Sequence, residues 1–184
     1  MAKAYRHLKF ISILLCILIV FGLVNIKRIG RVVFPMKYQK QIYTYSNTYK
    51  VDPLLIASII RAESSFLLRA KSHKGAIGLM QIMPKTGRWA AKEIGIKNYS
   101  DEKLYDEDIN IIIGCWFVNK LSVEFDGNMD LVLAAYNAGS GNVNKWINDG
   151  KISIDNIENI PFVETKNYVK RISIYLKIYK FLYN

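Results

Sequence analysis

Glu63 is the residue in this sequence best suited to acid–base chemistry. It ends the apolar stretch 54–63 and precedes a segment rich in serine and glycine. A carboxyl group at a helix C-terminus meets an unfavourable dipole, and apolar neighbours disfavour its charged form. Both effects raise the pKa towards the value that suits a general acid near neutral pH. Taken alone, the position fits an exposed surface glutamate at least as well.

Two further segments combine polar side chains with small or flexible residues. Residues 75–84 (GAIGLMQIMP) place Gln81 among apolar residues after two glycines, which permit tight turns and close ligand approach. Residues 134–139 (AAYNAG) place Tyr136 and Asn137 between small residues that leave room for a ligand. Each segment also has a purely structural interpretation, either a packed loop or a helix C-cap with the tyrosine in the core.

The elements that must position these side chains are predicted to be helices. Asp52 and Pro53 form a helix start, with a capping side chain followed by proline at the first helical position. Apolar residues recur at helical spacing elsewhere, and no segment alternates with period two over the length of a strand. The sequence therefore predicts a predominantly α domain. We expect helices at 35–50, 52–63, 84–94, 106–125, 129–138, 143–148 and 164–182, and an irregular lobe at 64–83.

Four separated motifs resemble the lytic transglycosylases of the soluble-lytic-transglycosylase, goose-lysozyme-like type, and occur in the same order. The resemblance spans residues 39–181, and Asn110 and Gly114 in the long helix also fit it. It implies a lysozyme-like single domain with a small irregular lobe at residues 35–184. The motifs are Glu63-Ser64, GLMQIMP at 78–84, AAYNAG at 134–139 and IPFVETKNYV at 160–169.

The resemblance implies a peptidoglycan lytic transglycosylase without metal or cofactor. Glu63 would be the single catalytic acid and base at the β-1,4 bond between N-acetylmuramic acid and N-acetylglucosamine, and the product would carry a 1,6-anhydro ring. Ser64 would help to hold the acid, Met83 would form an apolar wall and Tyr168 would tune Glu63. The residues implied to hydrogen-bond the glycan or its stem peptide are Ser72, Gln81, Tyr136, Asn137 and Glu164.

Two alternatives remain open on the same scaffold. One is a lysozyme-type muramidase, which would hydrolyse the bond and release a product heavier by one water. The other is a non-catalytic wall-binding or assembly protein, against which the intact Glu63, Gln81, Asn137 and Tyr168 argue. A partner in cell-wall or secretion machinery is left unspecified by the sequence.

Residues 1–34 are expected to form an N-terminal anchor and linker. Residues 10–24 carry no charge and follow three basic residues. This length also suits a signal peptide, but no pair of small residues for cleavage follows the apolar run. We therefore expect residues 10–26 to enter the membrane, with the catalytic domain on the extracytoplasmic side. The alternative is secretion after cleavage of a signal.

The net charge of +11 lies mainly at the two ends of the chain. Residues 1–50 hold nine basic and no acidic residues, residues 51–165 have a net charge of −3, and residues 166–184 hold five basic and no acidic residues. Because the central span is slightly acidic, we expect no nucleic-acid partner. Two cysteines and two histidines cannot form a disulfide scaffold or a histidine-rich metal site.

Overall fold

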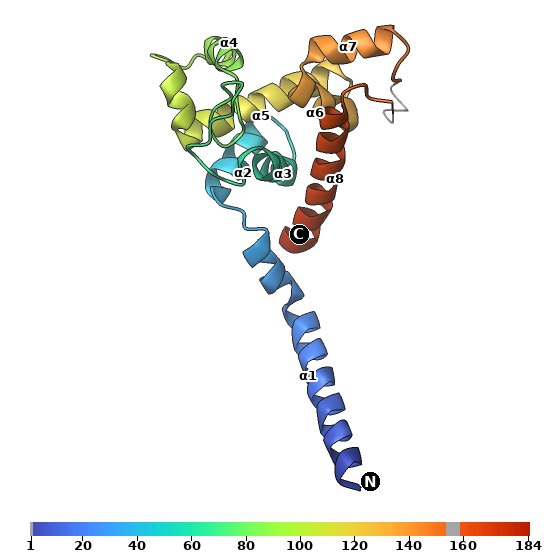
Figure 1. Cartoon of the computed structure of the whole chain (residues 1–184). Helices are drawn as coiled ribbons and strands as arrows, with labels where there is room; N and C mark the ends of the chain where they lie inside the picture. Colours follow the sequence, from blue (N-terminus) through green and yellow to red (C-terminus); the bar gives the residue numbers. More distant parts are fainter. Residues whose placement is uncertain (1, 154–158) are drawn as a thin grey trace.

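The computed structural model describes residues 2–153 and 159–184, and its regular elements are helical (Figure 1). This agrees with the predicted α class and irregular lobe. The helices are α1 (Ala2–Val33), α2 (Gln39–Thr48), α3 (Pro53–Ser64), α4 (Pro84–Ile94), the 3₁₀ helix η1 (Asp101–Tyr105), α5 (Glu107–Glu124), α6 (Met129–Ala138), α7 (Ser140–Asn148) and α8 (Val163–Tyr183).

Local capping chemistry explains where several helices begin. The predicted start of α3 is confirmed, since the Asp52 carboxylate accepts a hydrogen bond from the Leu54 N–H at 2.8 Å. Helix α2 begins four residues later than predicted, because Tyr38 takes a left-handed conformation with φ of 55°. Helix α7 begins at Ser140 rather than Val143, because Gly139, with φ of 86°, ends α6 and immediately starts α7.

Helix α3 is the centre of the hydrophobic core. Every residue from 54 to 60 is buried, so α3 is covered around its whole circumference, as expected of a central helix. Helix α8 packs along α3 and also contacts α6, while α2 lies between α3 and α5. The packing of α8 and α2 against α3 therefore fixes the position of the end of α3, where Glu63 lies.

The irregular lobe is a folded loop of residues 65–83. Two isolated β-bridges, Lys71 to Ile77 and Ile77 to Ile82, fold it back on itself. Gly78 has φ of +79°, and a side chain there would collide with Asn110 and with the backbone of Leu104.

One buried side chain, Asn110 of α5, holds this lobe in place. Its amide donates to the Ile77 carbonyl at 3.0 Å and to the Leu104 carbonyl at 2.8 Å, and its oxygen accepts from the Met80 N–H at 2.8 Å. Ile77 and Met80 belong to the irregular lobe, and Leu104 belongs to the short 3₁₀ helix η1. Asn110 thus supplies hydrogen bonds that the irregular chain cannot make internally.

The N-terminal part of helix α1 extends away from the other helices, and its C-terminal end lies near the end of α8 (Figure 1). Its segment Tyr5–Gly22 is long and apolar enough to cross a membrane, and none of that segment is buried inside the protein. The apolar run predicted from the sequence is therefore not a core helix of the domain. By length and composition alone, α1 fits a membrane span.

Replacing Asn110 by alanine is expected to lower the free energy of unfolding by about 3 kcal/mol or more. The change leaves three buried backbone groups unpaired, at about 1–3 kcal/mol each. Urea unfolding of the purified protein measures the loss. The control is Asn144→Ala, which removes one exposed contact to Glu124 and should cost less than about 1 kcal/mol. Equal losses in the two variants would contradict the role of Asn110.

Candidate active site

The carboxyl group of Glu63 and the hydroxyl group of Tyr168 form the centre of the candidate site. Glu63 lies in the last turn of α3, and Tyr168 lies in the second turn of α8. The Tyr168 hydroxyl donates to Glu63 Oε1 at 2.7 Å. Tyr168 itself is 2% exposed, so its ring is fixed by packing. The contact leaves Oε2 as the oxygen of Glu63 that can exchange a proton with a ligand.

Burial raises the pKa of the Glu63 carboxyl to about 7. The hydrogen bond from Tyr168 and the positive charge of Arg171 act in the opposite direction, while the charge of Glu164 adds to the rise. Burial also raises the pKa of the Tyr168 hydroxyl well above its ordinary value, so this group remains a donor. A carboxyl group with this pKa can both give and take a proton near neutral pH, as the sequence predicted.

Ser64 lies behind the site rather than in its wall. Its side chain is buried, and its hydroxyl donates to the Leu79 carbonyl at 2.8 Å and to the Ile60 carbonyl at 3.3 Å. It joins the end of α3 to the irregular lobe. This geometry suits a residue that positions its neighbour Glu63, and Ser64 does not line the cavity beside Glu63.

Seven of the predicted residues line one cavity of about 340 Å³. The cavity lies between the irregular lobe, the end of α6 and the start of α8. The motifs that the sequence placed far apart are thus brought together around the Glu63 carboxyl. The seven are Glu63, Ser72, Gln81, Met83, Tyr136, Asn137 and Glu164, and His73, Lys74 and Ala76 complete the lining.

Hydrogen bonds to the protein fix the polar wall of this cavity. The Tyr136 hydroxyl donates to the Met80 carbonyl at 2.8 Å. The Gln81 amide donates to the Gly78 carbonyl at 2.8 Å and to the Ala70 carbonyl at 3.3 Å. Its oxygen has no partner among the residues that the structure describes. Gln81 is therefore held by its nitrogen and presents an acceptor to the cavity.

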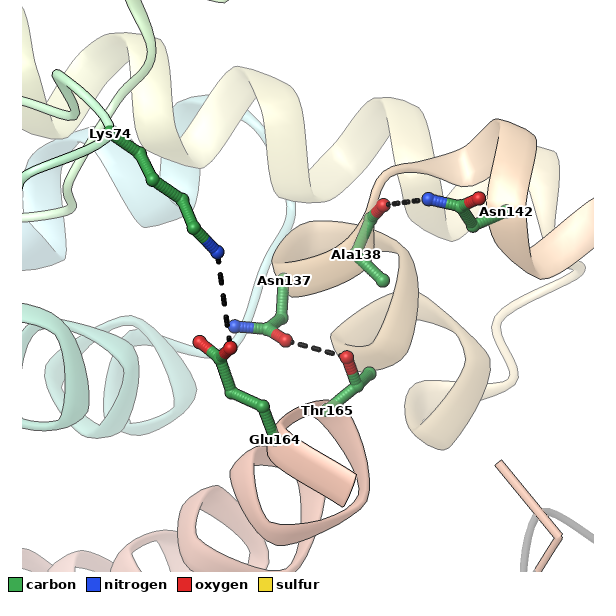
Figure 2. Close-up of polar contacts among 6 residues, drawn as sticks. All are labelled: Lys74, Asn137, Ala138, Asn142, Glu164 and Thr165. Carbon is green, nitrogen blue, oxygen red and sulfur yellow. Dashed lines mark hydrogen bonds and ion pairs between the residues drawn. The ribbon is translucent and has the colours of Figure 1, made fainter. Parts of the chain in front are cut away.

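Asn137 and Glu164 lie on facing helix ends at the rim of the cavity (Figure 2). The Thr165 hydroxyl donates to Asn137 Oδ1 at 2.8 Å, which leaves the amide nitrogen to donate elsewhere. The Glu164 carboxylate is 3.9 Å from the Lys74 ammonium, which reaches across from the irregular lobe (Figure 2). Both charged side chains are largely exposed, so this pair contributes little to stability.

A second hollow of about 340 Å³ continues the cavity along the protein surface. Both hollows are lined by Lys74, Gln81, Met83, Tyr136 and Asn137. Beyond these shared residues the second hollow runs over Thr86 and Phe117 to Gly139. The two hollows together form an elongated groove, a shape that suits a chain-like ligand more than a compact one.

Sequence reasoning gave no role to several residues of the groove. His73 and Lys74 are exposed side chains that join the cavity lining. The only indication in the sequence that His73 and Lys74 belong to the groove is that they directly follow Ser72. Arg171 lies near Glu63 because it follows Tyr168 by three residues on the same face of α8, a spacing that could have indicated it. Among the described residues, no group of three His, Cys, Asp or Glu side chains is arranged as metal ligands.

Comparisons with known proteins agree with one another and cover most of the chain. Residues 40–158 match the family model described as the transglycosylase SLT domain. The soluble lytic murein transglycosylase of Escherichia coli is 36% identical over 152 residues, which are 80% of this chain and 24% of that protein. The membrane-bound lytic murein transglycosylase C of Glaesserella parasuis is 31% identical, over 74% of this chain and 44% of the relative.

Solved structures share the same fold. The lytic transglycosylase Slt of Pseudomonas aeruginosa, crystallised as an inactive mutant, is 36% identical with a TM-score of 0.75. The match covers 81% of this chain and 25% of that one. The chain thus spans about a quarter of the length of the soluble relatives that it matches. By sequence and by fold, the chain belongs to the transglycosylase SLT domain family.

Proposed function

We propose that this chain is a peptidoglycan lytic transglycosylase. It would cleave the β-1,4 bond between N-acetylmuramic acid and N-acetylglucosamine and leave a 1,6-anhydromuramoyl end. The observation that carries the proposal is a single enclosed carboxyl group, Glu63, with a pKa of about 7 at an elongated groove. Family membership supports the same activity.

In the first step, protonated Glu63 acts as a general acid. Its Oε1 accepts the hydrogen bond from Tyr168, so the transferable proton lies on Oε2. That proton passes to the glycosidic oxygen, the bond from this oxygen to C1 of the muramic acid breaks, and N-acetylglucosamine leaves with a free hydroxyl. The positive charge that develops at C1 is stabilised by the N-acetyl group of the same sugar.

In the second step, the Glu63 carboxylate acts as a general base. It takes the proton from the 6-hydroxyl of the muramic acid, and O6 forms a bond to C1 that closes the anhydro ring. The Glu63 carboxyl is again protonated and no water is consumed. The same residue serves both steps because its pKa lies near neutrality.

The other carboxylate of the groove, Glu164, is suited to binding rather than to chemistry. Its side chain is 76% exposed, and it lies beside the Lys74 ammonium. Ordinary glycosidases use two carboxyl groups, and substrate-assisted enzymes are the exception. The exposed position of Glu164 favours the substrate-assisted route, in which the substrate supplies its own nucleophile.

We also propose that α1 anchors the protein in a membrane, with residues 1–34 as anchor and linker and residues 35–184 as the catalytic domain. The apolar length of α1 and the similarity to a membrane-bound relative support this arrangement. Because the proposed substrate is outside the cell, the catalytic domain would lie on the extracytoplasmic side.

Glu63→Gln is expected to lower the rate of peptidoglycan cleavage by about 10³-fold or more, because the amide can neither give nor take the proton. Digestion of purified sacculi followed by mass spectrometry measures both rate and product. The matched control is Glu93→Gln, the same change at an exposed site on α4, which should act like the wild type. A wild-type product heavier by one water would identify a hydrolase and contradict the proposed reaction.

Tyr168→Phe is expected to move the basic limb of the pH–rate profile upwards by about one pH unit. The hydroxyl hydrogen bond lowers the pKa of Glu63, so its removal raises that pKa further and keeps the acid protonated to higher pH. Tyr45→Phe removes a remote hydroxyl contact to Asp108 and should leave the profile unchanged. A limb that stays in place or moves down would exclude this coupling.

The variant Glu164→Gln tests whether Glu164, at the rim of the groove, binds the substrate or acts as a catalytic nucleophile. A binding role predicts a KM that rises several-fold while kcat changes by less than about ten-fold. Initial rates on soluble muropeptide oligomers give both constants. If kcat fell as far as in Glu63→Gln with KM unchanged, Glu164 would be a second catalytic carboxylate and the single-acid mechanism would be wrong.

A further inference from the structure

The C-terminal part of α1 is joined to the last turn of α8. Arg31 Nε donates to the Leu182 carbonyl at 2.8 Å, and Lys27 Nζ donates to the Asn184 carbonyl at 3.4 Å. Gly30 lies against the Leu182 side chain, with no space for a Cβ. Two cations thus satisfy carbonyl groups at the C-terminal end of α8, where the helix dipole favours positive charge.

Aromatic residues extend this junction into the chain after α1. The Tyr183 hydroxyl donates to the Phe34 carbonyl at 2.8 Å and accepts from the Met36 N–H at 3.0 Å. The Tyr179 hydroxyl donates to the Pro35 carbonyl at 3.1 Å, and the Phe34 ring contacts the Tyr179 ring edge-on at 6.0 Å. The segment between anchor and domain is therefore held against α8 by several side chains.

The junction gathers exposed cations and an aromatic ring on the neighbouring ends of α1 and α8. We call the set Lys27, Arg28, Arg31, Lys177 and Phe181 the basic foot, and each of these residues is exposed. Lys27 Nζ lies 5.6 Å from the centre of the Phe181 ring, and Arg31 lies 5.2 Å from that of Tyr183. Arg28 and Lys177 have no ion-pair partner in the part of the chain that the structure describes.

The charged side chains of the basic foot are all positive. Residues 1–50 and 166–184 contain no acidic side chain. The acidic side chain that contacts this end of α8 is Asp52, which pairs with Lys180 at 3.5 Å and not with the foot. A surface of this kind is complementary to an anionic one.

The position of the foot along α1 indicates which anionic surface it meets. Lys27 follows the uncharged run 10–24 after two further uncharged residues, so a bilayer that contains this run places Lys27 and Arg28 at its headgroups. The last turn of α8 lies beside Lys27 and brings Phe181 to the same level. Lys177 lies one turn before Phe181 on the same face of α8. Cations and amphipathic or aromatic side chains are the groups that favour this interface.

We propose that the basic foot binds the anionic headgroups of the bilayer that α1 enters. The proposal rests on the proposed anchoring by α1 and is independent of catalysis. It gives the C-terminal end of α8 a role in contacting lipid headgroups. Helix α8 then carries the foot residue Phe181 near its C-terminal end and Tyr168 near its N-terminal end, about 20 Å apart along the helix axis. The active site is held at a fixed height above the membrane rather than on a flexible tether.

Three single-site probes on the full chain test the proposal in vesicles. Native Cys16 lies in the apolar run, and Cys115 is buried, so Cys16 is the thiol open to a fluorescent label. Cys16→Ser with Asn184→Cys places the label beside the foot without removing a foot residue. Cys16→Ser with Lys92→Cys places it on α4, on the side of the helical domain away from the end of α8 (Figure 1). Acrylamide reports exposure to water, and a doxyl lipid reports contact with the bilayer.

In vesicles of phosphatidylcholine with one quarter phosphatidylglycerol, we expect the probe at 184 to be shielded from acrylamide and quenched by the doxyl lipid. Shielding should weaken in pure phosphatidylcholine and at high salt. Arg28→Glu with Lys177→Glu should abolish it, since each cation is worth about five-fold in binding to an anionic surface. The control Lys92→Glu with Lys97→Glu makes the same charge change on α4 and just after it, and this variant should retain the shielding.

Two results would overturn the proposal, and they are distinguishable. In the first, the Cys16 label is shielded but acrylamide reaches the probe at 184 as easily as the probe at 92. This result would show that α1 anchors the protein and that the foot does not contact lipid. If the Cys16 label were open as well, the anchoring by α1 would fail and the foot with it. Cleavage of sacculi in detergent should be unchanged in Arg28→Glu with Lys177→Glu, which keeps both results separate from the proposed reaction.

Discussion

The contact between the Tyr168 hydroxyl and the Glu63 carboxyl depends on the packing of α3 against α8, and the proposed chemistry depends on that contact. Packing encloses the carboxyl and raises its pKa, while the hydrogen bond occupies one oxygen and leaves the other for proton transfer. A carboxylate without the hydrogen bond would be poorly oriented, and one without the enclosure would be ionised at neutral pH. The two helices therefore set both the direction and the protonation state of the acid.

The irregular lobe adds a groove to this frame. Its backbone satisfies part of its polar groups internally, and Asn110 of α5 and Ser64 of α3 supply partners to others. These contacts fix the segment that carries Gln81 and Met83 opposite the carboxyl. The proposed catalytic acid thus lies on a rigid helix, and the groove is lined partly by residues of α6 and α8 and partly by a loop that two buried polar residues hold in place.

Much of this arrangement could be predicted from the sequence, because its signals are local. Asp52-Pro53 predicted the start of α3, and the resemblance implied which separated residues belong to one site. The approach of Tyr168 to Glu63 was implied only by the resemblance, since 105 residues separate them. The part that His73 and Lys74 take in lining the groove could not be predicted, because the path of the lobe depends on Asn110. The junction of Arg31 with Leu182 joins the two ends of the chain, and no local pattern indicates it.

One measurement tests the central claim most directly: titration of the Glu63 carboxyl in the full-length protein. Carbon-13 NMR of protein labelled at the glutamate side-chain carboxyl, with the Glu63 signal assigned by its loss in Glu63→Gln, follows the protonation of this group. We predict a midpoint of about 7, which leaves the group able to act as acid and then as base near neutral pH. A midpoint near the ordinary value of 4.5 would leave Glu63 ionised at neutral pH and would contradict the single-acid account.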